Sequence, residues 1–459
     1  MKYFNQITVK TTLLLALILT SCDSFTEVDM PQSQLTGTSV FTDVSTATAA
    51  VADIYARMRE GGVATGTASG LSSLMSNYSD EFTFFGTNTD LESFNRHTLV
   101  PSNYYLSNLW NTTYGQIYAA NAVIEGLEKA TAIKEIDRNT LKGEALFIRA
   151  YLYFNLVNLF GDIPYATTTD YATNATLFKA TVEQVNQKII DDLLLSEKLL
   201  PENYPTEERV RANKSVVIAL LARVYLYNEE WEQAALQAEK VIVNPLYRWE
   251  ENPATVFLKN SPSIIFSLHP GIAGLNTKDA RTFVFSSGPP SKSVLSNAFL
   301  NNFETGDLRK KLWTRTITNG TNSWTHTYKY KKTTNTGTSQ EYTILFRLAE
   351  QYLIRAEARA QLGNILGAQQ DVNKIRNRAG LANTTATTQV SLVVAVLQER
   401  KMELFTEQGL RWFDLKRTGL ANSILEATQP NWKSNQIILP LPESELLLNN
   451  NLLPQNTGY

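Results

Sequence analysis

The sequence of 459 residues has a single cysteine, Cys22, and only three histidines. A single cysteine excludes a disulfide within the chain and leaves only a bridge to another molecule. His97, His269 and His326 lie far apart, and none has a cysteine or a second histidine at the spacing of metal ligands. The chain also lacks a glycine-rich phosphate loop and a Gly-x-Ser-x-Gly motif. We therefore expect no metal and no cofactor.

A surplus of basic residues is also missing. The chain has 42 Lys and Arg against 44 Asp and Glu, for a formal net charge of −2. Proteins that bind nucleic acids need basic residues to neutralise phosphates. The charge balance therefore excludes nucleic acid as the expected partner.

The apolar run near the N-terminus is too short to span a membrane. Two lysines precede "TTLLLALILT" (11–20), which has the length of a secretory signal and falls well short of the roughly 20 apolar residues of a membrane helix. The run is followed by "SC", and "LTSC" resembles the lipobox of bacterial lipoproteins. We expect residues 1–21 to be a lipoprotein signal peptide and Cys22 to carry lipid, which would hold the protein on a membrane. A buried structural cysteine is the alternative.

The rest of the chain divides into a polar tether at 22–40 and a body at 41–459. Near residue 250 the sequence of the body changes from helical periodicity to short strand-like runs. Apolar periodicity predicts helices in both parts of the body. Residues 74–105 are expected to be an aromatic-rich loop, and 250–345 to contain short strands such as 263–268, 281–287 and 325–332. The expected helices are 44–59, 106–130, 137–160, 181–199, 213–228, 231–244, 346–362, 365–379, 389–406 and 409–416.

Two helical pairs have the same internal spacing. Small residues at fixed positions let two helices approach closely, as in tetratricopeptide repeats, and Gly363 lies where the turn needs a positive φ. The sequence therefore predicts a mostly α fold with a tetratricopeptide-like helical-hairpin scaffold, irregular loops and short β-hairpin inserts. The matching positions are Ala222, Trp231 and Ala234 in the first pair and Ala356, Ile365 and Ala368 in the second.

Several long motifs resemble one known family. They are "ALFIRAYLYFNLVNLFGDIPY" (145–165), "LARVYLYNEEWEQA", "RLAEQYLIRAEARAQLGN", "VNKIRNRAGL", "ERKMELFTEQGLRWFDLKRTG" (399–419) and the C-terminal "LPLPESELLLNNNLLPQNTGY". In this order they resemble the SusD/RagB family of outer-membrane nutrient-binding lipoproteins. The resemblance implies a lipid-anchored protein on the outer membrane, facing the cell surface. It also implies a non-catalytic lid that captures an oligosaccharide for a SusC-like TonB-dependent β-barrel transporter.

Charged residues near the C-terminus could be mistaken for a catalytic constellation. Each acid has a basic neighbour within a helical turn, which lowers carboxylate pKa values and opposes a general-acid role. We expect a structural ion-pair network rather than the carboxylate pair of a glycosidase. The residues are Glu399, Arg400, Glu403, Arg411, Asp414 and Arg417.

A sugar site needs flat aromatic faces and a few polar groups. Trp231, Trp313 and Trp412 lie in helical or framework motifs, whereas Trp324 lies in the polar segment "NGTNSWTHTY". An aromatic residue on a loop is the better functional hint. The segment 77–90 offers further candidates, although such residues can also merely anchor a loop. The expected ligand-binding residues are Trp324, Tyr78, Asp80, Phe84, Phe85 and Asn88.

Three other functions stay open from the sequence. One is a lid that binds peptides, which needs backbone hydrogen bonding and charge capture. The second is a surface glycosidase, which would cleave a polysaccharide. The third is an adaptor that uses its helical repeats to bind another protein. The aromatic-rich loops favour a glycan.

Overall fold

The computed structural model describes residues 39–459, of which Phe41–Tyr459 form one compact unit. These residues are mostly helical with a few short strands, so the predicted mostly α fold is confirmed. The expected signal peptide, Cys22 and nearly all of the expected tether lie outside the described residues. From residue 39 onward, each helix is too short or too polar to cross a membrane.

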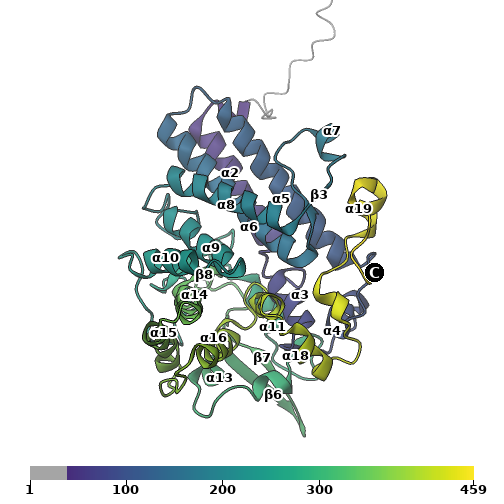
Figure 1. The fold of residues 1–459 in the computed structure, drawn as a ribbon, viewed down its shortest axis with the longest axis vertical. Helices are drawn as coiled ribbons and strands as arrows, with labels where there is room; N and C mark the ends of the chain where they lie inside the picture. Colours follow the sequence, from purple (N-terminus) through teal and green to yellow (C-terminus); the bar gives the residue numbers. More distant parts are fainter. Residues whose placement is uncertain (1–38) are drawn as a thin grey trace, which may run out of the picture. The chain divides into compact units, whose positions relative to one another are not determined.

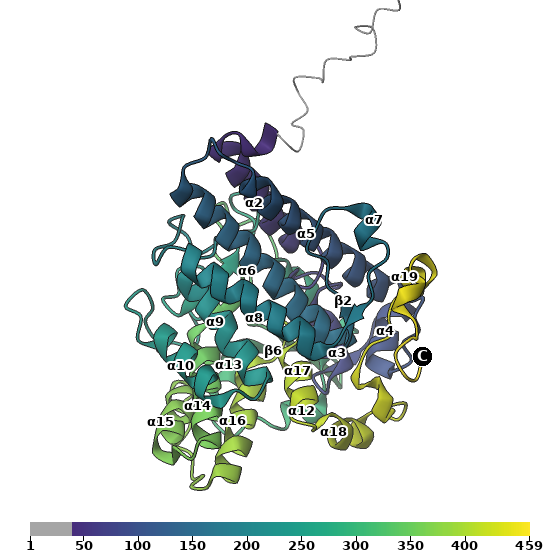
Figure 2. The same cartoon turned by 45° about the horizontal axis from the view of Figure 1, so that its top comes forward.

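A row of helices forms the scaffold, and each helix packs against the next one in the row. Figure 2 shows α5, α6 and α8 side by side. α10 packs against α14 although the strands of the second half lie between them in the sequence. The row consists of α5 (Tyr104–Glu128), α6 (Glu135–Phe160), α8 (Val182–Leu199), α9 (Lys214–Tyr227), α10 (Trp231–Ile242), α14 (Leu348–Gln361), α15 (Ile365–Arg378) and α16 (Gln389–Leu404).

The two predicted helical pairs are α9 with α10 and α14 with α15. Ala222, Ala234, Ala356 and Ala368 are all fully buried, because these small side chains lie where the paired helices meet. Gly363 follows α14 with a φ of +77°, which allows the tight turn into α15. The small-residue spacing therefore identified both hairpins, and the stretch between them interrupts the repeat.

Residues 74–105 differ from the expected loop. They contain the second half of α3 (Leu71–Tyr78), then β1 (Phe82–Phe84) and α4 (Thr89–Arg96), and they end where α5 begins. α3 is rich in serine, which is typical of a turn, yet all of its residues are buried. It packs against α4 and α17 (Leu410–Arg417), and this tertiary packing outweighs its weak helix propensity.

The second half of the body holds short strands and helices between α10 and α14. β5 pairs with β1 antiparallel, so that Phe84 lies opposite Ser293, while β4 pairs with β8 and β6 with β7. Residues 281–287 were predicted as a strand, and this was wrong because the end of α11 and a loop occupy them. The elements are β4 (Ile264–Leu268), α11 (Lys278–Phe283), β5 (Ser293–Leu295), α12 (Asn297–Leu300), α13 (Leu308–Trp313), β6 (Thr314–Asn319), β7 (Asn322–Thr327) and β8 (Thr343–Arg347).

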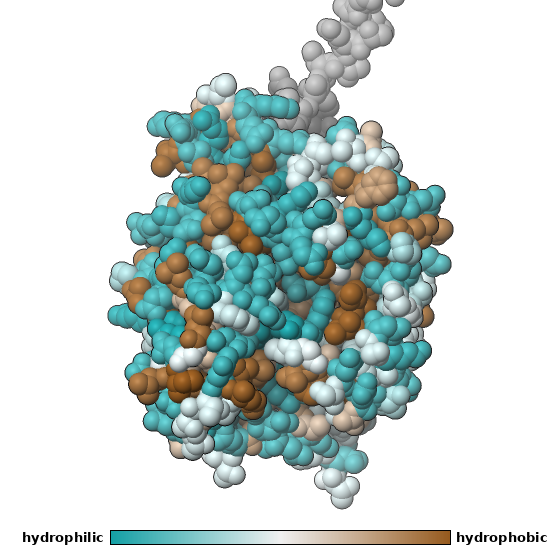
Figure 3. All heavy atoms as spheres, in the orientation of Figure 1, coloured by the Kyte–Doolittle hydropathy of each residue, from teal (hydrophilic) through white to brown (hydrophobic). Residues whose placement is uncertain are grey.

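The remaining elements complete the body around the row of helices. Figure 1 and Figure 2 show α18 and α19 in yellow, on the same side of the body as α4. On the face shown in Figure 3, hydrophilic side chains predominate and hydrophobic ones form separate groups, as is usual for a surface in contact with water. These elements are α2 (Val44–Glu60), β2 (Ile163–Pro164), α7 (Tyr171–Asn174), β3 (Lys179–Ala180), α18 (Ala421–Thr428), α19 (Glu443–Leu448) and the 3₁₀ turns Ser39–Phe41, Ser434–Ile437 and Asn450–Leu452.

The C-terminal charged residues form buried ion pairs, as predicted. Asp414 accepts from Arg400 at 2.7 Å and pairs with Arg417 at 2.8 Å. Glu403 lies between Arg347 and Arg378, and these arginines hold its pKa below the ordinary value although burial alone would raise it. The acids are therefore ionised scaffold groups.

Candidate functional site

Two of the predicted site residues are buried and have no surface for a ligand. The Tyr78 ring is fully buried, meets the Trp412 ring edge to face at 4.8 Å, and its hydroxyl donates to the Gln436 carbonyl oxygen at 2.8 Å. Asp80 accepts from Arg411 at 2.7 and 2.9 Å and pairs with Lys401 at 2.9 Å. Burial alone would raise the pKa of Asp80, but these two cations hold it below the ordinary value. The prediction that Tyr78 and Asp80 bind ligand was therefore wrong, because Tyr78, at the end of α3, and Asp80, two residues later, are both buried in the core.

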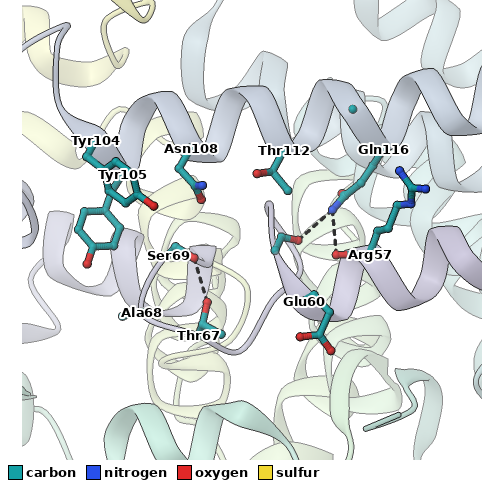
Figure 4. Close-up of a pocket in the computed structure, with 12 residues that line it drawn as sticks. Arg57, Glu60, Thr67, Ala68, Ser69, Tyr104, Tyr105, Asn108, Thr112 and Gln116 are labelled. Carbon is teal, nitrogen blue, oxygen red and sulfur yellow. Dashed lines mark hydrogen bonds between the residues drawn. The ribbon is translucent and has the colours of Figure 1, made fainter.

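An open cleft of about 730 Å³ lies beside α5 and is here called the α5 cleft. Figure 4 shows a row of side chains on α5 that faces the C-terminal end of α2 and the loop after α2. Its volume suits a ligand of several sugar rings or a drug-sized molecule. The lining residues are Arg57, Glu60, Gly61, Thr67, Ala68, Ser69, Tyr104, Tyr105, Asn108, Thr112, Gly115 and Gln116.

Aromatic surface lies at one end of the α5 cleft. Tyr104 is 63% exposed, and its ring meets the Tyr105 ring edge to face at 5.3 Å. Asn103 caps the helix by accepting from the Leu106 amide at 3.1 Å, so both tyrosines lie in the rigid first turn of α5. The exposed ring offers a flat apolar face of the kind on which the C–H groups of a sugar ring pack.

Polar groups occupy the rest of the α5 cleft. Glu60 pairs with Lys278, which lowers the pKa of Glu60, so the carboxylate is an ionised acceptor. Gln116 donates through Nε2 to the carbonyl oxygens of Arg57 and Gly61 at 3.1 and 3.0 Å. Its Oε1 is buried without a partner among the described residues. The cleft therefore presents the Glu60 carboxylate as an acceptor, and Asn108 and Thr112, which can both donate and accept, to a hydroxylated ligand.

A second cavity of about 360 Å³, here called the insert cavity, adjoins the α5 cleft, with Ala68 lining both. Asn88 lies on the boundary, since its Nδ2 donates to the Tyr105 hydroxyl at 3.4 Å. The β1–β5 pair holds the two walls together. The lining residues are Ala68, Ser73, Asn77, Phe84, Gly86, Thr87, Asn88, Leu91, Arg281, Thr282, Phe283, Ser291, Lys292 and Ser293.

The other four predicted site residues lie at or near the insert cavity. Phe84 and Asn88 line it, and Phe85, which follows Phe84, is 43% exposed. Trp324 lies on β7 rather than on a free loop, is half-buried, and its ring lies so close to Gly288 that a β-carbon there would stand 2.1 Å from Trp324 Cζ3. Trp324 therefore packs against the loop that leads into the insert cavity and does not itself line the cavity.

Sequence reasoning missed the α5 cleft. Tyr104 and Tyr105 were placed at the end of a loop, whereas they begin α5. The signal that could have found them is the asparagine cap at 103 followed by Tyr104, Asn108 and Thr112, which lie four residues apart along one helix face.

The two cavities contain no arrangement for metal chemistry. Between residues 39 and 459, no group of three His, Cys, Asp or Glu side chains is placed to hold a metal ion. Glu60 is the one carboxylate among the residues that line the α5 cleft and the insert cavity.

The row of paired helices forms a tetratricopeptide-like scaffold, and an open cleft lies beside it. A family model described as "Starch-binding associating with outer membrane" matches residues 27–226, and the model of the SusD family matches residues 291–459. The chain belongs to the SusD/RagB family. The family resemblance inferred from the sequence motifs is thereby confirmed.

Relatives and solved structures agree with this assignment. SusD-like protein P2 from Formosa agariphila is 27% identical over 436 residues, covering 82% of this chain and 85% of the relative. A SusD superfamily structure from Bacteroides vulgatus matches with a TM-score of 0.80 and 22% identity over 91% of this chain and 99% of that one. A laminarin-binding SusD-like protein matches with a TM-score of 0.77 and 24% identity over 90% of this chain and 99% of that one. These structural matches establish the fold.

Proposed function

We propose that this protein is a glycan-binding lipoprotein of the outer membrane that delivers an oligosaccharide to a SusC-like TonB-dependent transporter, acting as its lid. The observation that carries the proposal is the α5 cleft, which combines the exposed ring of Tyr104 with a row of polar side chains. Two structural neighbours support a glycan, since one is named as laminarin-binding and another, from Bacteroides uniformis, as a surface glycan-binding protein.

Membrane attachment through Cys22 is part of the proposal. The "LTSC" motif follows a short apolar run, and the matched family model is described as associating with the outer membrane. Several acyl chains at one residue hold a protein on a membrane far more firmly than one chain does. The same arrangement would place the body next to a transporter in the same membrane.

Binding without turnover is the expected activity. A glycosidase needs two carboxyl groups that flank the scissile bond, one of them protonated. Glu60 is the one carboxylate that lines the α5 cleft or the insert cavity, and its lowered pKa keeps it ionised. Incubation of the protein with the bound oligosaccharide should therefore release no product.

A carbohydrate array tests glycan binding, with the body from residue 23 onward as the probe and a peptide library as the second arm. We expect retention on one class of glycan and none on peptides. Tyr104→Ala should abolish that retention. Tyr118→Ala is the matched control, because Tyr118 is a 52% exposed tyrosine of the same helix that lines neither the α5 cleft nor the insert cavity. It lines a separate cavity of about 350 Å³ that residues of α5, α7 and α19 also line, so loss of retention in this variant would point to that cavity instead. Retention on peptides alone would support the peptide-binding lid instead.

A further inference from the structure

Two cations lie in the wall of the insert cavity, and no carboxylate accompanies them. Arg281 and Lys292 are the only charged residues among those that line this cavity. The chain as a whole carries a net charge of −2, so a local excess of positive charge is not a general feature of the molecule. The insert cavity therefore has a positive potential that the α5 cleft, with one Arg and one Glu, does not share.

The backbone holds both cations in place without neutralising them. Lys292 donates through Nζ to the carbonyl oxygens of Arg281 and Val284, and burial lowers its pKa. Arg281 is exposed and donates through Nε to the Thr333 carbonyl oxygen at 3.2 Å. Neither side chain forms an ion pair within residues 39–459, which leaves the third Lys292 hydrogen and both terminal Arg281 nitrogens for a ligand. By contrast, Lys278 of the same helix as Arg281 pairs with Glu60.

Further cations lie on and just after the β6–β7 hairpin that carries Trp324. Arg315 and Lys331 lie over the ring of Tyr328, each at 5.4 Å from its centroid. Arg315 and Lys292 both lie close enough to His326 to lower its pKa, after the larger effect of burial. His326 therefore lies within reach of the charges of both Lys292 at the insert cavity and Arg315 on the hairpin.

The Glu341 carboxylate, next to Lys331, is already occupied by backbone amides. Glu341 accepts from the backbone amides of Lys331 and Lys332 at 2.8 to 3.0 Å. Within residues 39–459, Arg281, Lys292 and Arg315 form no ion pair with any acid, Glu341 included. Arg281 and Lys292 share the insert cavity with Phe84 and Phe283, and this combination is suited to a ligand that is both negatively charged and cyclic.

We propose that the insert cavity and the adjoining hairpin bind an anionic substituent of the glycan, so that the ligand is an acidic polysaccharide fragment bearing sulfate esters or uronate carboxylates. This inference rests on the proposed glycan-binding function and specifies its substrate class. The neutral α5 cleft binds the sugar rings that follow, and Asn88 lies where the two parts of the site meet.

The test is calorimetric titration of the body with three oligosaccharide series of equal length: neutral laminarin fragments, uronate-bearing oligogalacturonides and sulfated carrageenan fragments. We expect an anionic series to bind at least tenfold more tightly than the neutral one, and its affinity to fall as salt is raised from 20 to 200 mM, because salt screens exposed charges. The series that binds identifies sulfate or carboxylate. Preferred binding of the neutral series, or affinity independent of salt, would overturn the inference and leave the proposed function standing. Binding of no glycan at all would overturn both.

Variants separate the cavity from general charge effects. Lys292→Gln and Arg281→Gln should each lower the affinity for the anionic series about tenfold, since each removes a charge-assisted hydrogen bond. Lys198→Gln, which removes one positive charge from an exposed position of α8, is the control and should leave the affinity unchanged. Arg281 is exposed, so its variant keeps the test valid if Lys292→Gln fails to fold. Equal affinity in all three variants would contradict the assignment.

Discussion

Substitution of Asp80 by asparagine removes the one carboxylate that neutralises two buried cations. Arg411 and Lys401 both contact Asp80, and all three side chains are 10% exposed or less. Two unit charges about 4 Å apart interact by about 4 kcal/mol at an effective dielectric constant of 20. Breaking a buried pair costs about 3–5 kcal/mol because the remaining charge is uncompensated. We expect Asp80→Asn to lower the free energy of unfolding by that amount at pH 7.

Arg411→Ala should cost less, about 2 kcal/mol, because Lys401 still neutralises Asp80. The assay is urea denaturation of both variants, with Glu92→Gln as the control, since the Glu92–Arg96 pair is exposed and contributes under about 1 kcal/mol. The pKa of Asp80 is lowered in the folded state, so its contribution is fully present above its unfolded pKa of about 3.9 and is lost as the pH falls through the folded value. The gap between wild type and Asp80→Asn should therefore narrow below about pH 4. An unchanged urea midpoint combined with lost glycan binding would contradict this and would indicate that Asp80 contacts the ligand.

Four further predictions follow from burial and charge. Tyr104→Ala should lower glycan affinity more than tenfold with almost no change in melting temperature, because the ring is 63% exposed; a large loss of stability would contradict this. Trp324→Ala should cost about 1–2 kcal/mol of stability, since the half-buried ring packs on the 284–292 loop, and it should also weaken glycan binding; a change in neither urea midpoint nor affinity would refute the placement. Burial and then Asp80 raise the pKa of Glu81 to about 7. The folded state therefore keeps a proton that the unfolded state loses, so stability falls as the pH rises from about 4 to 7. Glu81→Gln should raise the urea midpoint at pH 8 but not at pH 4, and an equal midpoint at pH 8 would contradict this. Cys22→Ala should move the protein from the membrane pellet to the supernatant with an unchanged melting curve, and retention in the pellet would argue against a lipid anchor.

The helical scaffold was predictable because its signals are local. Ala222, Ala234, Ala356 and Ala368 repeat at fixed gaps, and helices need small residues wherever their backbones approach closely. The predicted helix 231–244 coincides with α10 to within two residues. Apolar periodicity and small-residue spacing can both be read from a short stretch of sequence, so they predict helices without knowledge of tertiary contacts.

The segment before α5 was not predictable from such windows. α3 reads as a polar turn, and only its burial between α4 and α17 explains why it is helical. The same packing decides the site. Tyr78 and Asp80 lie in or next to α3 and point into the core, while Phe84 and Asn88, a few residues later, line the insert cavity. Which aromatic residue in a loop-like segment reaches the surface depends on contacts with residues more than 300 positions away, such as Arg411.

Direct titration of the body with the oligosaccharide selected on the carbohydrate array, alongside Tyr104→Ala and Tyr118→Ala, measures whether the α5 cleft is the binding site. The structure predicts saturable binding without product release, lost in Tyr104→Ala and retained in Tyr118→Ala. Binding that survives Tyr104→Ala, or heat evolution accompanied by cleaved sugar, would contradict it.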